Sequence, residues 1–569
     1  MRSWGIGEVA RLLGVKTHVI RYWESELPLL SPPRGLTGRR QYCSREIELL
    51  LKVRHLLYER KYTLEGARRA MWEELEGDGG DRRARLSAIR AELIDALMTL
   101  RARGDSGGEA GMEMDVMRRF DAIGQGHLFG HWEARPPLMK QRLLEDLLAL
   151  DMALLSELCS LLDRPRPAAE EIIPAPFIPA AESRVDAEAR AIGEDLVRRG
   201  KTAFLTVAGG QGSRLGFDGP KGMYPASPIR RLTLFALLAE KIRAARRWYG
   251  ISSPWLVMTS QANRAATEHY FATEGFFGLG RDTVRFFSQA MLPALYPDGR
   301  LVMAGDGGLF LSPNGHGGVV EGLRREGLLE ALRGQGVEEL FYFQVDNPLV
   351  TIPDPVFMGF HRRDGAEVST KVVRKACAEE KLGSIALAAG RPCVVEYSDM
   401  PDDLMRARGN DGDLLFPQGS IAIHIFSVDF LLRADLRLPY HLARKSVQAL
   451  NPAPRGTDIQ EEEAIKMESF VFDTIPLARR ALFFEVERAE EFAPLKNREG
   501  VDSVETCTRG QVEKAARWLE ACGVQVSRDE RGAPVHAIEI SPLFAADPGI
   551  LAAKRGSLKD SIDEDTLLA

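Results

Sequence analysis

The chain has 569 residues, of which 45% are hydrophobic and 27% charged, and its formal net charge at pH 7 is −6. This length exceeds one ordinary hydrophobic core, so roughly two to four domains are expected. No run of about 18 apolar residues could span a bilayer, and the N-terminus lacks the apolar segment of a signal peptide. The 6 cysteines form no CxxC pair, which argues against a zinc site or a disulfide framework. We therefore expect a protein of the reducing cytoplasm, without a membrane partner.

Charge is distributed unevenly along the chain. Residues 1–71 carry 14 Lys and Arg against 7 Asp and Glu, whereas the rest of the chain is acidic. A small basic segment on an acidic body is typical of a nucleic-acid-binding module joined to a protein of another function.

Two short helices separated by a tight turn are predicted within this basic segment. Gly14 stands where the first helix must end, and Thr17 can cap the second. The spacing fits a helix-turn-helix with Arg21 and Tyr22 on the recognition helix. The basic turn Gly38–Tyr42 follows, in the place of a wing.

Four segments resemble the DNA-binding domain of the MerR regulator family: Ile6–Ala10, Val19–Glu24, Arg39–Tyr42 and Tyr62–Leu64. The resemblance covers roughly residues 5–71 and implies a winged helix-turn-helix that binds double-stranded DNA. The DNA contacts that it implies come from Thr17, Arg21, Tyr22, Arg39, Arg40 and Tyr42. The alternative is a basic helical cap without a DNA function, because positive charge alone supports only non-specific phosphate binding.

A helix predicted over 82–104 carries apolar side chains along one side: Leu86, Ile89, Leu93, Leu97 and Leu100. The MerR resemblance implies a homodimer formed through the head and this helix. The stripe is only about three heptads long, so it fits a packing helix equally well. Amphipathic helices follow over 116–122 and 137–162. His127 and His131 lie between them without a third ligand, which favours structural packing over a metal site.

A buried strand, Leu205–Val207, leads into a glycine-rich turn from Ala208 to Gly216. Glycines let backbone N–H groups face a phosphate without an intervening Cβ atom. Arg214 and Lys221 follow closely and add positive charge. The stretch therefore predicts a phosphate-binding loop, and a purely structural turn is the alternative.

Apolar strand-like runs alternate with helical patterns beyond this loop, as at Trp255–Thr259, Leu340–Val345 and Ala422–Phe426. The alternation predicts an α/β domain whose ligand lies at the carboxyl ends of the strands. Asp346 ends one of these strands. Mg²⁺ prefers hard oxygen ligands and keeps several waters, so one carboxylate together with substrate phosphates can hold it. We expect Asp346 to bind Mg²⁺, with a helix cap or a turn as the alternative role.

Seven segments occur in the order of the eukaryotic-type UDP-N-acetylhexosamine and UDP-sugar pyrophosphorylase family: Ala208–Gly216, Pro220–Tyr224, Gln344–Asn347, Val394–Ser398, Lys466–Asp473, Phe492–Asn497 and Glu539–Leu543. The resemblance covers roughly residues 115–545. It implies transfer of a uridylyl group from UTP to a sugar 1-phosphate, which gives a UDP-sugar and pyrophosphate. Such a transfer depends on positioning and charge neutralisation rather than on covalent catalysis.

The resemblance also implies a role for each matching residue. Catalytic contacts to the phosphates are assigned to Arg214, Lys221 and Lys496. Nucleotide binding is assigned to Ala208, Gly209, Gly210, Gly212, Gln289 and Gly315. The sugar pocket is assigned to His316, Gly383, Glu396, Tyr397 and Ser420. His316 and Ser420 stand where the N-acetylhexosamine enzymes carry asparagines, and a polar group left unpaired there would cost about 1–3 kcal/mol. The sugar therefore stays open between N-acetylglucosamine, glucose and another hexose.

The expected fold is multidomain: an α winged helix-turn-helix head, then an α/β nucleotidyltransferase core with a Rossmann-like mixed sheet, a helical N-terminal part and a small α+β C-terminal part. The parts are the head at 1–75, the helix and glycine-rich linker at 76–112, the helical part at 113–182, the nucleotidyltransferase domain at 183–480 and the C-terminal domain at 481–569. The polar tail from Gly556 is expected to be mobile. Three interpretations remain: an active uridylyltransferase with a DNA-binding head that regulates transcription, a MerR-type regulator whose pyrophosphorylase part senses a UDP-sugar, or an enzyme with a vestigial head.

Overall fold

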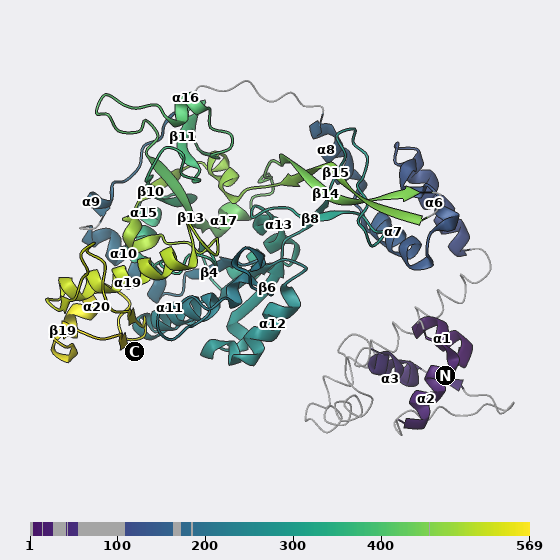
Figure 1. Ribbon diagram of the computed structural model, residues 1–569, viewed down its shortest axis with the longest axis horizontal. Coiled ribbons are helices and arrows are strands. Elements are labelled where there is room, and N and C mark those ends of the chain that lie inside the picture. The colour runs from purple at the N-terminus through teal and green to yellow at the C-terminus, as the bar shows by residue number, and fades with distance from the viewer. Residues whose placement is uncertain are drawn as a thin grey trace. The chain divides into compact units, whose positions relative to one another are not determined.

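The computed structural model describes residues 4–13, 15–26, 41–42, 44–54, 108–162, 172–183, 186–453 and 456–569 (Figure 1). The chain divides into two compact units, Met1–Gly130 and His131–Ala569. The division falls inside the part at 113–182 for which helices were predicted. The helix predicted over 82–104 lies outside the described residues.

The first unit begins with three helices around a small apolar core. They are α1 (Ile6–Leu13), α2 (Thr17–Glu26) and α3 (Ser44–Arg54), accompanied by the antiparallel pair β1 (Trp4–Gly5) and β2 (Gln41–Tyr42). Leu13, Ile20, Trp23 and Ile47 are buried in the core, so each helix contributes its apolar stripe. A further helix of this unit, α6 (Gly108–Asp121), follows.

A 10-stranded mixed sheet forms the centre of the second unit, with the path β12-β11-β13-β9-β4-β5-β6. Its strands are β3 (Ile172–Pro174), β4 (Thr202–Val207), β5 (Trp255–Thr259), β6 (Val284–Ser288), β9 (Glu339–Gln344), β10 (Val368–Arg374), β11 (Ser384–Ala388), β12 (Arg391–Val395), β13 (Gln418–Ser427) and β16 (Ala481–Glu485). Strands β9, β4, β5 and β6 run parallel, and β13 runs antiparallel to β9. The predicted α/β core with a mixed sheet is confirmed.

Helices cover both faces of this sheet because successive strand side chains alternate between two apolar clusters. Phe204 and Phe341 join one cluster, with helices α10 (Ala187–Arg198), α11 (Leu234–Tyr249), α12 (Arg264–Thr273) and α15 (Pro355–Arg363). Leu205 and Tyr342 join the other, with α13 (Gly318–Arg325), α14 (Leu328–Gly334) and α17 (Val428–Leu431). Short helices α9 (Ala180–Ser183), α16 (Asp402–Met405) and α18 (Arg488–Glu491) complete the domain.

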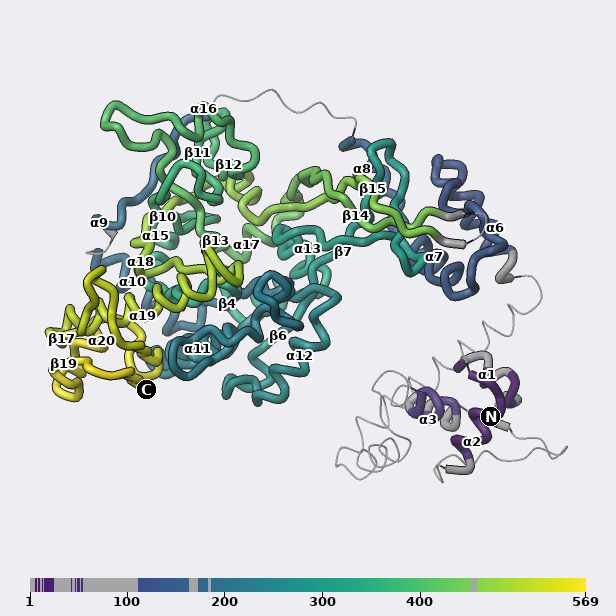
Figure 2. Tube along the Cα trace, in the orientation of Figure 1, coloured from purple at the N-terminus to yellow at the C-terminus, as the bar shows by residue number. Residues whose placement is uncertain are grey.

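A long two-stranded ribbon extends from the sheet domain, as the tube in Figure 2 shows. It consists of β14 (His441–Ala453) and β15 (Gly456–Glu468), and β15 lies beside the short pair β7 (Met291–Pro293) and β8 (Leu311–Pro313). Helices α7 (Pro137–Ala149) and α8 (Met152–Leu162) precede the sheet in sequence. Asp146 of α7 accepts a hydrogen bond from the Leu309 N–H at 2.9 Å, which attaches that helix to the loop before β8.

The C-terminal part is built on α19 (Val504–Ala521) and α20 (Pro548–Ala553). The prediction of a mobile tail is wrong: β19 (Ser561–Ile562) pairs with β17 (Gln525–Val526), and β20 (Thr566–Leu568) pairs with β18 (Ile538–Ile540). Polar composition suggested mobility, but Ile562 and Leu568 pack in the apolar cluster around α19.

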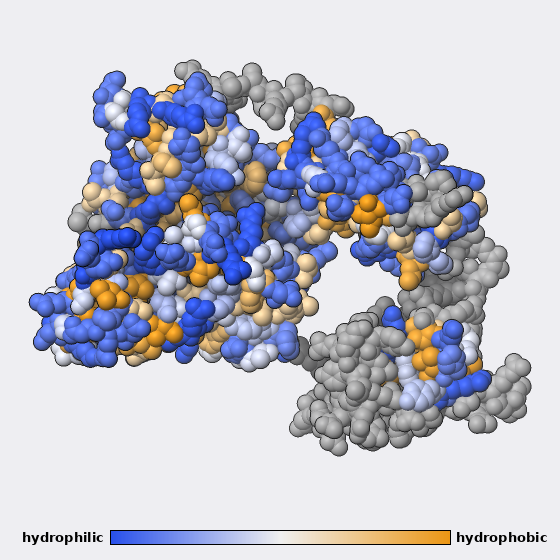
Figure 3. Space-filling view, in the orientation of Figure 1, coloured by the Kyte–Doolittle hydropathy of each residue, from blue (hydrophilic) through white to orange (hydrophobic). Residues whose placement is uncertain are grey.

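The surface of the second unit is mostly hydrophilic on the face that Figure 3 shows, with small separate apolar patches. No helix in the described ranges is both long and apolar enough to cross a membrane.

Candidate active site

The glycine-rich loop begins at the carboxyl end of β4, in the middle of the sheet. It folds back on itself, because Lys221 N–H donates to the Gly210 carbonyl at 3.1 Å and Gly212 N–H donates to the Gly219 carbonyl at 2.9 Å. The side-chain amide of Asn263 donates to the carbonyls of Ala208 and Gly210, at 3.0 and 3.3 Å. The loop is thus fixed from both sides, and Asn263 is a supporting residue that the sequence analysis missed.

Two backbone N–H groups of this loop are available to a ligand. Within the described residues, the N–H groups of Gly209 and Gly210 donate no hydrogen bond. Gly209 is half-buried and Gly210 is exposed, so both N–H groups can reach an anion that binds at the end of the strand. The side chain of Gln289 lies beside Gly209 and is only 8% exposed. A Cβ atom at Gly209 would lie 3.2 Å from the Gln289 side-chain nitrogen.

Lys221 and Asp346 form an ion pair, with Nζ and Oδ2 2.8 Å apart and side chains only 15% and 12% exposed. The sheet explains this pairing. β4 and β9 are parallel neighbours with Val207 opposite Gln344, so the segments after both strands emerge at the same edge. The predicted phosphate-binding lysine and the predicted metal carboxylate therefore lie together.

Lys496 reaches the same place from the C-terminal part of the chain. Leu495 N–H donates to the Asp346 carbonyl at 2.8 Å. The side-chain amide of Asn347 donates to the Glu491 carbonyl at 2.7 Å and accepts from Ala493 N–H at 3.2 Å. Asn347 is buried, and its two hydrogen bonds hold the segment that carries Lys496. The sequence analysis quoted Asn347 within a motif without giving it this role.

One pocket brings together residues that lie far apart along the chain. Its lining includes six of the predicted site residues: His316, Asp346, Gly383, Glu396, Ser420 and Lys496. Lys381 and the apolar side chains of Ile423, Phe472 and Phe492 line it too, and the sequence analysis did not select them. The glycine-rich loop adjoins this pocket through the ion pair between Lys221 and Asp346.

Tyr397 and Arg214 are among the predicted residues that do not line this pocket. Tyr397 follows Glu396 but is not among the residues that line this pocket, and it is 41% exposed. The chain turns after β12, which directs Glu396 inward and leaves its neighbour outside. Arg214 is exposed on the glycine-rich loop. Arg498 lies near this loop, since a Cβ atom at Gly216 would be 3.5 Å from its Nη1 atom. The sequence analysis missed Arg498, although it stands two residues after Lys496.

A model of the family described as UTP–glucose-1-phosphate uridylyltransferase matches residues 173–505. The chain belongs to this family. UDP-N-acetylglucosamine pyrophosphorylase of Saccharomyces cerevisiae is 35% identical over 441 residues, which are 72% of this chain and 92% of that protein. The human UDP-N-acetylhexosamine pyrophosphorylase-like protein 1 is 35% identical over 476 residues, covering 76% and 93%.

Solved structures give the same assignment. The uridine diphosphate N-acetylglucosamine pyrophosphorylase from Trypanosoma brucei, crystallised with an inhibitor, superimposes with a TM-score of 0.64. It is 25% identical and covers 80% of this chain and 98% of its own. A second family model, of the MerR HTH regulatory proteins, matches residues 5–74. Both predicted resemblances are confirmed.

His316 lies on one side of the active-site pocket as a neutral imidazole. Val471 N–H donates to its Nδ1 atom at 3.1 Å, so the ring proton belongs on Nε2. Burial, with the charge of His441 as a smaller cause, lowers the pKa of His316 to about 4. The turn before it requires glycine: Gly315 has φ +79°, and a Cβ atom there would lie 2.5 Å from the Ser469 carbonyl oxygen. His316 can thus donate to a ligand but carries no charge.

Glu396 brings a carboxylate to the same side of the pocket. Burial raises the pKa of Glu396, and the neighbouring charge of Asp399 adds to the rise. A Cβ atom at Gly383 would lie 2.5 Å from a Val394 methyl group and 3.5 Å from Glu396 Oε1. Gly383 therefore leaves room for the strand that presents Glu396.

The first unit, Met1–Gly130, is called the MerR-like unit from here on. Its predicted DNA-binding residues divide into three groups. Thr17, Arg21 and Tyr22 are exposed along one face of α2, where Tyr22 is 58% exposed. Tyr42 is fully buried in the core of this unit and donates a hydrogen bond to Glu24, so its predicted contact with DNA is wrong in this structure. Its aromatic ring supplies core packing instead. Arg39 and Arg40 lie outside the described residues.

Proposed function

We propose that residues 131–569 transfer a uridylyl group from UTP to N-acetylglucosamine 1-phosphate, giving UDP-N-acetylglucosamine and pyrophosphate. The observation that carries this proposal is the pocket that Asp346 and Lys496 share with His316, Gly383 and Glu396. The yeast relative is named for this product, and its alignment with this chain covers 92% of the yeast protein. This match favours N-acetylglucosamine over glucose or another hexose.

The reaction forms one P–O bond and breaks another. An oxygen of the sugar phosphate attacks the α-phosphorus of UTP in line, and the bond to the β-phosphate oxygen breaks as pyrophosphate leaves. Negative charge spreads over the phosphate oxygens in the transition state, so the protein mainly has to position the two substrates and neutralise this charge. In this proposal the N–H groups of Gly209 and Gly210 hold the triphosphate. Lys221 and Lys496, on either side of Asp346, neutralise negative charge on the phosphates.

Asp346 fits the requirement for Mg²⁺. No group of three or more possible metal ligands occurs among the described residues, so the protein supplies one carboxylate rather than a cage. Oδ2 of Asp346 is paired with Lys221, and Oδ1 makes no hydrogen bond within the described part of the chain. A single carboxylate beside a phosphate site suits Mg²⁺, which takes its remaining ligands from water and phosphate oxygens. Held by Asp346, Mg²⁺ would help to neutralise the negative charge of the phosphates.

Pyrophosphate release from UTP and Mg²⁺ tests the proposal. The 1-phosphates of N-acetylglucosamine, N-acetylgalactosamine, glucose and galactose are offered in turn. We expect the fastest turnover with N-acetylglucosamine 1-phosphate and its loss in Lys496→Ala. Lys559→Ala, an exposed lysine of the C-terminal tail that pairs with Glu564, is the matched control. Faster turnover with a hexose 1-phosphate would overturn the sugar assignment.

We further propose that the MerR-like unit binds double-stranded DNA through α2. The match over residues 5–74 and the exposed face of Thr17, Arg21 and Tyr22 support this proposal. Fluorescence anisotropy with DNA from upstream of the chain's own coding region tests it at several salt concentrations. We expect Arg21→Ala to weaken binding about tenfold and Arg54→Ala on α3 to change it little. Equal binding to unrelated DNA would reduce the unit to a non-specific phosphate binder.

A sensor is the second candidate, favoured by the MerR match alone. In that case the second unit binds a UDP-sugar and reports it to DNA without turnover. Absence of pyrophosphate release with every sugar, combined with tight UDP-sugar binding, would select the sensor. The retained charges of Lys221, Asp346 and Lys496 favour the enzyme.

A further inference from the structure

A second pocket lies behind the segment that carries Lys496. This open pocket of about 660 Å³ is called the C-terminal pocket here, and it is lined by Phe492–Pro494, Gly500–Asp502, Arg531–Ala533, Arg488 and one face of α19. Phe492 and Pro494 also line the active-site pocket. The segment from Phe492 to Lys496 is therefore the wall between the two pockets.

Helix α19 forms the floor of the C-terminal pocket. Thr506, Arg509, Gly510 and Glu513 line it, and their spacing places them on one face of the helix. Gly510 lets the separating segment lie directly on this face, because a Cβ atom there would be 2.8 Å from the Ala493 Cβ. The separating segment therefore packs directly against this face of α19.

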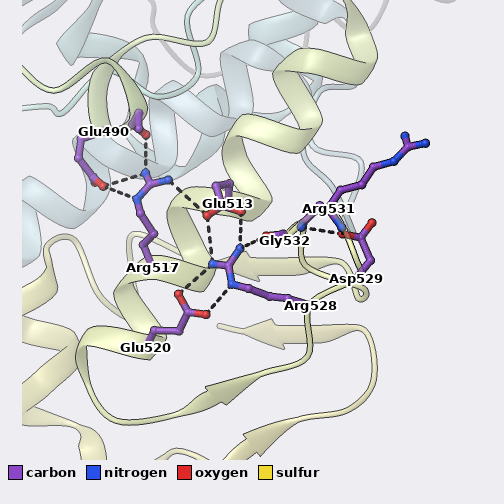
Figure 4. Close-up of polar contacts among 10 residues, drawn as sticks. Glu490, Glu513, Arg517, Glu520, Arg528, Asp529, Arg531 and Gly532 are labelled. Carbon is purple, nitrogen blue, oxygen red and sulfur yellow. Dashed lines mark hydrogen bonds and ion pairs between the residues drawn. The ribbon is translucent and has the colours of Figure 1, made fainter.

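A braced turn presents Arg531 at the rim. Asp529 Oδ1 accepts hydrogen bonds from the N–H groups of Arg531 and Ala533, at 2.9 and 2.8 Å. Arg528 donates to the Gly532 carbonyl at 2.6 Å and is itself held by Glu513 and Glu520. Figure 4 shows the Arg531 side chain extending away from this cluster. The turn is fixed, whereas the Arg531 guanidinium remains available to a ligand.

Positive charge in the C-terminal pocket is only partly compensated. No carboxylate of the described residues pairs with the Arg531 guanidinium. Arg509 has only an exposed partner, Glu505, at 3.7 Å, and such surface pairs contribute little. The carboxylate of Glu513 is instead occupied by two arginines, Arg517 and Arg528. Guanidinium groups match the geometry of phosphate oxygens, so the two arginines favour a phosphate group.

We propose that the C-terminal pocket binds a phosphorylated small molecule, a phosphate monoester, through Arg509 and Arg531, and that binding changes turnover at Lys496. Asp502 links the two sites. Its carbonyl accepts hydrogen bonds from the N–H groups of Lys496 and Asn497, at 2.7 and 3.0 Å. Its carboxylate lies 3.5 Å from Lys496 Nζ, and the residue itself lines the C-terminal pocket. A ligand there acts on the backbone and the charge that position Lys496.

Calorimetric binding of a hexose 6-phosphate to the full chain tests the site. This probe carries its phosphate away from the anomeric carbon and cannot be the sugar substrate. We expect Arg509→Ala and Arg531→Ala each to weaken binding about tenfold, the loss of one charge-assisted contact. Arg555→Ala, a C-terminal arginine that pairs with Asp560, is the matched control. No binding to the unaltered chain at millimolar probe, or binding that Arg214→Ala abolishes and Arg531→Ala leaves intact, would overturn the proposal.

Kinetics then test the link to Lys496. We expect the hexose 6-phosphate to change kcat at least about twofold without changing the KM for UTP. Arg531→Ala should keep the basal rate and lose this response, whereas Asp502→Asn should bind the probe without responding. Binding that leaves kcat unchanged would overturn the link. Because the calorimetric arm needs no turnover, failure of this site and failure of the uridylyltransferase proposal are distinguishable.

Discussion

The two sides of the active-site pocket are built differently. On the phosphate side, Lys221 and Asp346 follow the parallel neighbours β4 and β9, so the sheet itself brings opposite charges to one edge. On the sugar side, His316 and Ser420 come from a glycine turn and from β13, and the buried imidazole is neutral. In the proposed reaction, the charges at the sheet edge act on the phosphates, whereas His316, Ser420 and Glu396 would select the sugar. The following changes test this contrast.

Removal of the charge at the sheet edge should have the largest effect. Asp346→Asn takes away the proposed Mg²⁺ ligand and leaves Lys221 without its partner, so we expect kcat to fall about 1,000-fold. Steady-state pyrophosphate release measures this loss. Asp435→Asn, a surface carboxylate paired with Arg433, serves as the control. A loss below tenfold would remove Asp346 from the phosphate side.

The support of Lys496 should matter next. Asn347→Ala removes two hydrogen bonds to the segment at Glu491 and Ala493, so Lys496 shifts and kcat falls about 100-fold. Lys496 contacts phosphate in the proposal, so the KM for the sugar 1-phosphate should change less than kcat. Asn451→Ala on the exposed ribbon is the matched control. An unchanged kcat would show that other contacts suffice to position Lys496.

Arg498 tests whether the phosphate side extends further than the predicted residues. Its guanidinium lies beside Gly216 of the glycine-rich loop. We expect Arg498→Ala to raise the KM for UTP and for pyrophosphate about tenfold, with little change in the KM for the sugar. Arg479→Ala at another exposed site provides the comparison. An equal rise for all substrates would indicate a structural role instead.

The buried imidazole of His316 predicts a smaller, pH-dependent effect on the free energy of unfolding. His316 has a folded-state pKa of about 4, below the unfolded value of 6.5, so the unfolded chain binds its proton first as the pH falls. This residue should lower the free energy of unfolding by about 1 kcal/mol between pH 7 and 5.5, with further loss down to about pH 4. Urea denaturation of the unaltered chain and of His316→Asn measures the difference. An identical pH dependence in both would contradict a buried neutral imidazole.

The sequence by itself determined the local parts of this protein. Strand periodicity and the glycine turn predicted the phosphate-binding loop, and the strand end predicted the place of Asp346, because each depends on neighbouring residues. Ordered motifs were sufficient for both family resemblances, which the matches over residues 5–74 and 173–505 bear out.

Only the tertiary structure decided how distant segments meet. Lys496 reaches Asp346 because the Asn347 amide holds the segment before it, and no spacing along the chain encodes that contact. Burial of Tyr42 and ordering of the tail around Ile562 also depended on packing against residues far away in sequence. The C-terminal pocket exists for the same reason: its arginines come from α19 and from a turn about twenty residues later, and packing alone places them beside the catalytic segment.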